Sequence, residues 1–92
     1  MKFTCPCCGY KTLKRNPPGT FEICKICFWE DDNFQYKNPD FKRGSNESSL
    51  NEARKNFLKI GASCERFLKY VRKPTNKDKK DLSWNILGKS QK

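Results

Sequence analysis

The chain has 92 residues, a formal net charge of +10 and no histidine. This length suits one small domain whose core supplies only about 3–5 kcal/mol of net stability, so we expect a metal or disulfides to reinforce it. No stretch approaches the ~20 apolar residues of a membrane-spanning helix, and the absence of histidine excludes an imidazole base.

The chain begins with two cysteine pairs at metal-binding spacing. Cys5 and Cys8 form a C-x2-C pair, and Cys24 and Cys27 form a second pair after fifteen intervening residues. Four thiolates at this spacing can surround one ion tetrahedrally. We therefore predict one structural Zn²⁺ bound by these four cysteines, with iron in the same all-sulfur geometry as the alternative. The spacing does not decide between Cys5 with Cys8 and the alternative ligand pairs that include Cys7. If Cys7 is not a ligand, we expect it to fill the turn.

The segment between the pairs has the composition of a hairpin. Residues 10–13 and 20–23 favour β structure, and a turn sequence that contains Pro17, Pro18 and Gly19 separates them. We predict that these two stretches pair and connect two metal-binding turns, which is the layout of a zinc ribbon.

Residues 28–48 have no clear period and predict a long aromatic loop. Phe28 and Trp29 are either core anchors or exposed anchors for a partner. Three consecutive carboxylates follow: Glu30, Asp31 and Asp32. Paired-carboxylate catalysis needs groups that face each other across a substrate, so this run predicts a solvated loop or an acidic contact patch. We predict that the protein is not an enzyme.

Two helices are predicted after this loop. Ser49 and Glu52 match a capping box, and Gly61 fits the end of the same helix. Its apolar stripe should face the core and contains Leu50, Ala53, Phe57 and Ile60. A second helix is predicted over residues 64–71, with Cys64 on its buried face.

Residues 74–92 are predicted to form a basic, flexible tail after a domain at residues 1–73. Within the tail, residues 82–87 alternate apolar and polar side chains around Trp84, which predicts a docking segment. Residues 72–92 contain seven Lys or Arg and two Asp or Glu, against five and four in residues 1–35. Five basic residues form a candidate nucleic-acid surface: Arg72, Lys73, Lys77, Lys79 and Lys80.

Three segments together resemble the bacterial cysteine-rich CPCC family. They are Cys5-Pro6-Cys7-Cys8-Gly9-Tyr10, the stretch from Gly19 to Asp32, and Ser49-Leu50-Asn51-Glu52-Ala53-Arg54. The resemblance covers roughly residues 4–73. It implies a small bacterial or phage protein of unknown function that binds zinc through the two cysteine pairs, and it assigns no role to residues 28–32.

The sequence therefore predicts a small α+β domain, with a zinc-ribbon β-hairpin and a four-cysteine zinc site followed by two short helices. No apolar segment precedes Cys5, so we expect a cytoplasmic protein with reduced thiols. We expect a non-catalytic module that binds a macromolecule, with no membrane and no small-molecule substrate. A protein is the first candidate, in a regulatory, inhibitory or immunity-type role, bound by residues 28–32 and Trp84. The alternative is nucleic acid bound by the basic C-terminal half. The acidic loop argues against this alternative, because it would repel phosphate groups.

Overall fold

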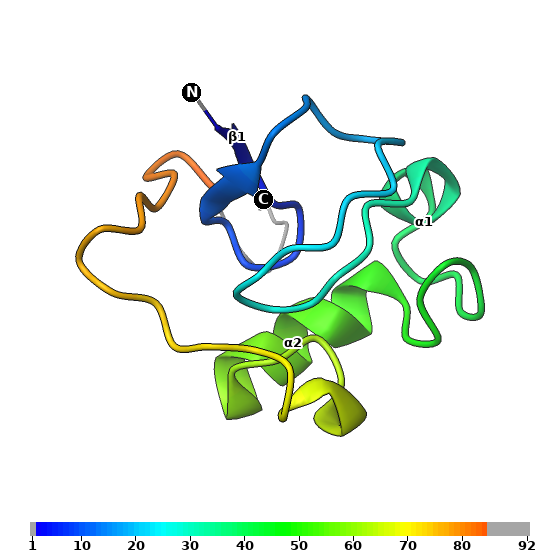
Figure 1. Ribbon diagram of the computed structural model, residues 1–92. Coiled ribbons are helices and arrows are strands. Elements are labelled where there is room, and N and C mark those ends of the chain that lie inside the picture. Colours follow the sequence, from blue (N-terminus) through cyan, green and yellow to red (C-terminus); the bar gives the residue numbers. More distant parts are fainter. Residues whose placement is uncertain (1, 85–92) are drawn as a thin grey trace.

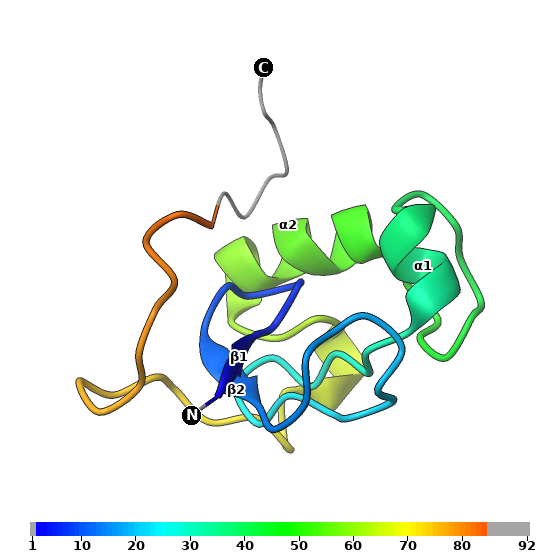
Figure 2. The same cartoon turned by 90° about the horizontal axis from the view of Figure 1, so that it is seen from above.

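Two short strands and two helices form the regular structure of residues 2–84, the part of the chain that the computed structural model describes. β1 (Phe3–Thr4) pairs antiparallel with β2 (Lys11–Leu13). α1 (Asn33–Lys37) and α2 (Leu50–Ile60) follow, and α2 runs along one side of the cysteine-containing turns (Figures 1 and 2). A single 3-10 turn, η1 (Glu65–Phe67), completes this small α+β fold.

The strand pairing differs from the predicted hairpin. β1 and β2 flank the first cysteine pair, and an antiparallel bridge between Ile23 and Glu30 flanks the second. Residues 10–13 thus pair with β1 rather than with residues 20–23. A C-x2-C turn reverses the chain direction, so the residues on its two sides are adjacent in space. Each metal-binding turn therefore lies at the tip of its own hairpin.

α2 begins and ends where the sequence predicts. Ser49 Oγ accepts from the Glu52 N–H at 3.1 Å, and Glu52 Oε1 accepts from the Ser49 N–H at 3.1 Å. These reciprocal bonds satisfy donors that a helix start otherwise leaves unpaired. At the other end Gly61 has φ of 82°, a left-handed conformation that glycine adopts without strain.

The buried face of α2 is only partly the predicted one. Leu50 and Ala53 are fully buried, and Phe57 is half-buried against the core. Ile60 is 37% exposed, so its predicted burial is wrong. Arg54, 7% exposed, lies on the buried face instead. A charged residue can lie there because its donors are satisfied by hydrogen bonds.

The predicted helix over residues 64–71 is wrong. Only the three residues of η1 are helical, and Cys64 is half-exposed rather than buried in a core. Contacts with the second cysteine turn fix this segment: the Ser63 N–H donates to the Cys27 carbonyl at 2.8 Å, and the Phe67 ring packs on Phe28. Tertiary contacts therefore override the apolar spacing of the segment.

The stretch predicted as a long loop, residues 28–48, contains α1 and a buried amide network. Gln35 is fully buried, and its Nε2 donates to the carbonyls of Phe41, Asn46 and Ser48 at 3.0, 3.0 and 3.1 Å. Buried backbone carbonyls need such partners. The network gives the stretch a defined path without further regular structure.

Residues 79–84 lie against the ribbon. The Lys11 N–H donates to the Lys79 carbonyl at 2.8 Å, and the Asp81 N–H donates to the Gly9 carbonyl at 2.9 Å. The chain passes around the outside of the fold to return beside β2 (Figure 1). As far as residue 84 this segment is therefore hydrogen-bonded to the domain rather than a flexible tail. Residues 85–87 of the predicted docking segment lie outside the described residues.

The helix face yields a direct test. Leu50→Ala should lower the free energy of unfolding by about 2–5 kcal/mol, because it removes a fully buried side chain. Ile60→Ala should cost less than about 1 kcal/mol, since this side chain is already partly in water. Urea denaturation of the metal-loaded proteins measures both values. Equal losses in the two variants would contradict the assigned face.

Candidate metal centre

Four cysteine sulfurs from the two turns converge at one point. All four Sγ atoms lie within 4.8 Å of one another, and all four residues are buried: Cys5, Cys8, Cys24 and Cys27. The Sγ–Sγ distance is 3.6 Å between Cys5 and Cys27 and 3.7 Å between Cys8 and Cys24. Disulfides are about 2.05 Å long. A tetrahedron with ~2.3 Å metal–sulfur bonds has edges of about 3.8 Å, so the cluster can hold one four-coordinate metal ion.

The two turns share one backbone pattern. In each turn the N–H of the first cysteine donates to the carbonyl five residues later, at 2.9 and 3.0 Å. The carbonyl of that cysteine accepts from the N–H four residues later, at 3.0 and 2.8 Å. That fourth residue has positive φ in both turns: 82° at Gly9 and 68° at Phe28. The turn therefore requires a left-handed residue, and only the first turn meets this with glycine.

Phe28 is held in its unfavourable conformation by stacking. Its ring centroid lies 4.8 Å from that of Phe67 and 5.2 Å from that of Tyr70. Positive φ is uncommon for a bulky residue, and aromatic pairs contribute about 0.5–1.5 kcal/mol beyond area burial. Phe28 therefore ties the second metal-binding turn to the chain around η1.

Burial of the four thiols sets the condition under which all of them can ionise. Burial raises the pKa of Cys5 and Cys27 well above the ordinary value for a thiol. The pKa of Cys24 is lowered instead, because the other thiols, Cys27 first, donate hydrogen bonds to its sulfur. Four thiolates cannot share this volume without a positive charge between them. A bound divalent ion would supply that charge and displace the thiol protons.

Two further donors hold the Cys24 sulfur in place. Thr12 Oγ1 donates to Cys24 Sγ at 3.0 Å, and the Ile26 N–H donates to it at 3.4 Å. β2 positions Thr12, so the first hairpin supports a ligand that belongs to the second turn. Nothing in the local sequence marks Thr12 for this role, because its contact with Cys24 depends on the tertiary arrangement.

Cys7 is fully buried and lies outside the four-sulfur cluster. This position favours the interpretation in which Cys7 fills the first turn. Next to it, Arg54 Nε donates to the Pro6 carbonyl at 3.0 Å. The Arg54 guanidinium carbon also lies 5.0 Å from the ring centroid of Trp84. Arg54 thus connects α2, the first turn and the C-terminal segment.

The sequence was compared with those of known protein families, and one family matches a region that includes all four clustered cysteines. The sequence profile described as Cysteine-rich CPCC matches residues 3–78, most of the chain. The chain belongs to the cysteine-rich CPCC family. No curated protein matches it. The matched region of this CPCC protein includes both metal-binding turns, α1 and α2. In residues 2–84, no helix has the length and apolar character needed to cross a membrane.

Trp29, Asp31 and Asp32 are buried in the fold, which corrects the exposure that their predicted role in partner binding requires. Trp29 is 1% exposed, so it cannot be an exposed anchor. Asp31 is fully buried, and its Oδ2 accepts from the N–H and Oγ1 of Thr20 at 2.9 and 2.8 Å. Asp32, 9% exposed, caps α1 by accepting from the Gln35 N–H at 2.9 Å. The Glu30 backbone is bonded on both sides by Asn46.

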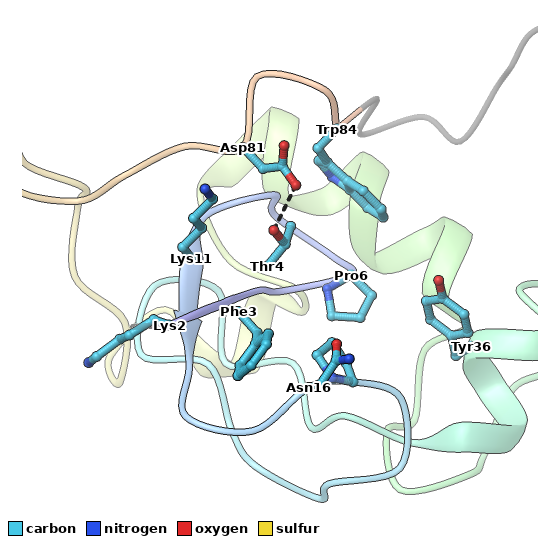
Figure 3. A pocket seen from close by; sticks show the side chains of 10 residues that line it. Lys2, Phe3, Thr4, Pro6, Lys11, Asn16, Tyr36, Asp81 and Trp84 are labelled. Atoms are coloured by element: carbon cyan, nitrogen blue, oxygen red, sulfur yellow. Dashed lines mark hydrogen bonds between the residues drawn. The ribbon is translucent and has the colours of Figure 1, made fainter.

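Trp84, the other predicted anchor, packs on its own domain. Its indole lies against Gly9, where an added Cβ would overlap the Cδ1 atom of the ring. One part of the side chain remains accessible and lines a pocket of about 430 Å³ beside β1 (Figure 3). Trp84 therefore closes over the first metal-binding turn and also forms part of a hollow surface.

The predicted basic residues separate into different surfaces. Arg72, Lys77 and Lys79 line a cleft of about 300 Å³. Lys73 instead lines a groove beside α2, and Lys80 Nζ lies 5.7 Å from the ring centroid of Tyr10. The cleft contains three lysines that the sequence analysis missed, from segments far from the tail: Lys2, Lys11 and Lys25. Only the tertiary fold brings these groups together, so charge counting along the chain could not find them.

Gly9 and Gly61 provide a matched pair for testing the close approach of Trp84. Both have φ of +82°, but a Cβ would meet Trp84 at Gly9 and nothing within 4 Å at Gly61. Gly61→Ala should therefore cost only the left-handed strain of about 1–2 kcal/mol. Gly9→Ala should cost clearly more by urea denaturation and should change the Trp84 fluorescence. Adding Trp84→Ala should recover part of that loss, and equal costs for the two glycines would contradict the packing.

Proposed function

We propose that this protein is a non-catalytic, zinc-stabilised module that binds nucleic acid through its basic cleft. One observation carries the proposal: lysines from four separated parts of the chain converge on one cleft at the edge of the metal centre. Thr12 lines this cleft and also donates to the Cys24 sulfur, so the cleft and the centre share a wall.

The ligand set supports zinc in a structural role. Four cysteine sulfurs leave no open coordination position for water or substrate, as in structural zinc sites. The chain also has no histidine that could act as a general base near neutral pH. The metal would therefore hold the two turns together while the surface around them carries the function.

The cleft has the charge that phosphate groups require. Six cations and a single carboxylate, Asp78, line it. Asp78 is already paired, because both its oxygens accept from Arg72 at 2.8 Å, and this contact holds the pKa of Asp78 well below its usual range. Among residues 2–84 no carboxylate pairs with the five cleft lysines, all of which are exposed. Phosphate contacts from such lysines supply most of non-specific nucleic-acid affinity.

The expected repulsion from the acidic loop does not apply to this surface. Asp31 and Asp32 direct their carboxylates to backbone and hydroxyl donors inside the fold. This burial removes the argument that favoured a protein over nucleic acid. The positive cleft can therefore approach phosphate without an opposing acidic patch from these two residues.

A protein partner is the second candidate, and one groove favours it. This groove of about 490 Å³ lies between α2 and the chain after η1, with Arg72 and Lys73 in its lining. Leu58 and Leu68 are 56% and 44% exposed there. Its cations favour an acidic amphipathic helix, whereas the +10 charge of the chain opposes a second copy. If this groove is the site, Leu68→Asp abolishes nuclease-resistant capture of a protein, and charge changes in the cleft do not.

The zinc hypothesis is tested by metal analysis. Protein purified from cells without added metal should contain about one zinc per chain. Cys24→Ser should lose the metal and unfold, because a binding free energy of ~10–16 kcal/mol is coupled to folding in such sites. Cys7→Ser and Cys64→Ser are the controls and should keep the zinc content of the wild type. Stoichiometric iron, or disulfides among the four cysteines, would refute the proposed cofactor.

The cleft hypothesis is tested by salt and by charge removal. Four or more phosphate contacts should weaken binding to single-stranded oligonucleotides on the order of tens-fold between 50 and 200 mM salt. Lys25→Gln combined with Lys77→Gln should weaken binding and reduce the salt slope by about 1.4. Fluorescence anisotropy with a labelled oligonucleotide measures both effects.

The matched control for this experiment is Lys55→Gln combined with Lys59→Gln. It removes the same charge from exposed positions on α2 that do not line the cleft. Binding should then change little beyond the effect of net charge. Equal losses in the two double variants would show that the cleft has no special role, and absent binding to any oligonucleotide would refute the proposal.

A further inference from the structure

A second hollow adjoins the basic cleft and differs from it in chemistry. This is the pocket of about 430 Å³ that Trp84 lines. Two other aromatic residues line it, Phe3 from β1 and Tyr36 from α1, so that its aromatic side chains come from three distant parts of the chain (Figure 3). Pro6 lies between these rings in the close-up view. The volume falls within the range of pockets that hold small planar ligands.

The pocket and the cleft share two residues, Lys2 and Lys11. The two hollows are therefore neighbours on one surface, separated by a pair of cations. A ligand with one phosphate in the cleft can place its adjoining group in the pocket, with these lysines between the two parts.

Apart from the two shared lysines, the polar groups of the pocket do not suit a phosphate. Asp81 contributes a carboxylate that accepts from Thr4 Oγ1 at 2.7 Å, and its pKa is held low, with the Ser83 hydroxyl as the main cause. This ionised carboxylate would repel an anion. Asn16 lines the same pocket, and its amide can both donate and accept. Aromatic rings together with an amide suit an uncharged, planar, hydrogen-bonding group.

The cleft is cationic and the neighbouring pocket is aromatic. We therefore infer that the pocket receives an unstacked base of a single-stranded nucleic acid whose phosphates lie in the basic cleft. This inference rests on the proposed function and adds to it the strand type and the place of the base. Single-strand binders combine a positive groove for the backbone with aromatic side chains that stack on bases. Bases within a duplex are stacked on one another and cannot enter such a pocket without being extruded.

The test compares oligonucleotides of equal length with the complete protein. A homothymidine single strand, the same strand with abasic sites throughout, and a duplex carry the same phosphate chemistry but differ in available bases. The homothymidine strand should bind about tenfold or more tighter than the abasic strand, because stacking contributes only to the first. It should also quench Trp84 fluorescence, which the abasic strand should leave unchanged.

The outcomes separate the inference from the proposed function. Equal binding of the single strand and the abasic strand would overturn the base pocket while leaving the phosphate cleft in place, and a preference for duplex would do the same. No binding of any of these oligonucleotides would overturn both. Thymidine monophosphate is the last ligand. If thymidine monophosphate displaces the homothymidine strand at a concentration equal to that of the strand, the pocket is a site for a free nucleotide. That result would overturn the assignment to a polymer.

A variant pair on one helix gives a second measurement. Tyr36→Ala should weaken binding of the homothymidine strand severalfold and leave abasic binding unchanged. Phe34→Ala is the control, since Phe34 is an exposed aromatic on the same helix that does not line the pocket. Equal effects of the two substitutions on the homothymidine strand would overturn the role of the pocket. Metal content and far-UV circular dichroism check that both variants are folded.

Discussion

The constraint on which the rest of the structure depends is the convergence of four buried cysteine sulfurs on one point, where they can hold a metal ion. A bound cation would hold the sulfurs of the two turns together more strongly than contacts between neutral thiols can. The strands are only two and three residues long, and hairpins of this size are marginal in water. A metal ion at this centre would therefore add stability that the sheet cannot provide.

Around this centre, ties between distant segments replace regular structure. Arg54 joins α2 to the first turn, and the Ser63 N–H joins the end of α2 to the second. Gly9 and Phe28 occupy equivalent positions in the two turns but meet the same backbone demand differently. Glycine leaves room for Trp84 to close over the first turn. Phenylalanine carries strain, which its stacking on the chain around η1 offsets.

The sequence predicted the features that depend on local geometry. Cysteine spacing identified the four clustered residues, and the capping box with Gly61 located α2. Features that depend on the tertiary fold were missed or wrong. The pairing of residues 10–13 with β1 follows from the reversal of the chain at the first metal-binding turn. Arg54 occupies the buried face of α2 because the Pro6 carbonyl accepts its hydrogen bond. Trp29 and Asp31 have the composition of an exposed recognition loop, yet their burial follows from packing that no local pattern records.

The same argument explains where the charge acts. Lys11 lies in β2, after the first cysteine pair, and Lys25 lies inside the second pair, while Lys77 and Lys79 arrive with the returning C-terminal segment. Their convergence requires both hairpins to be fixed relative to each other, which a metal ion bound by the four cysteines would accomplish. Binding of an anion at the proposed cleft would therefore be coupled to metal binding. Because such coupling is reciprocal, a bound phosphate chain would in turn raise the apparent affinity for the metal. A four-cysteine metal site can thus influence recognition of an anion without contacting it. It would do so by holding together lysines that repel each other.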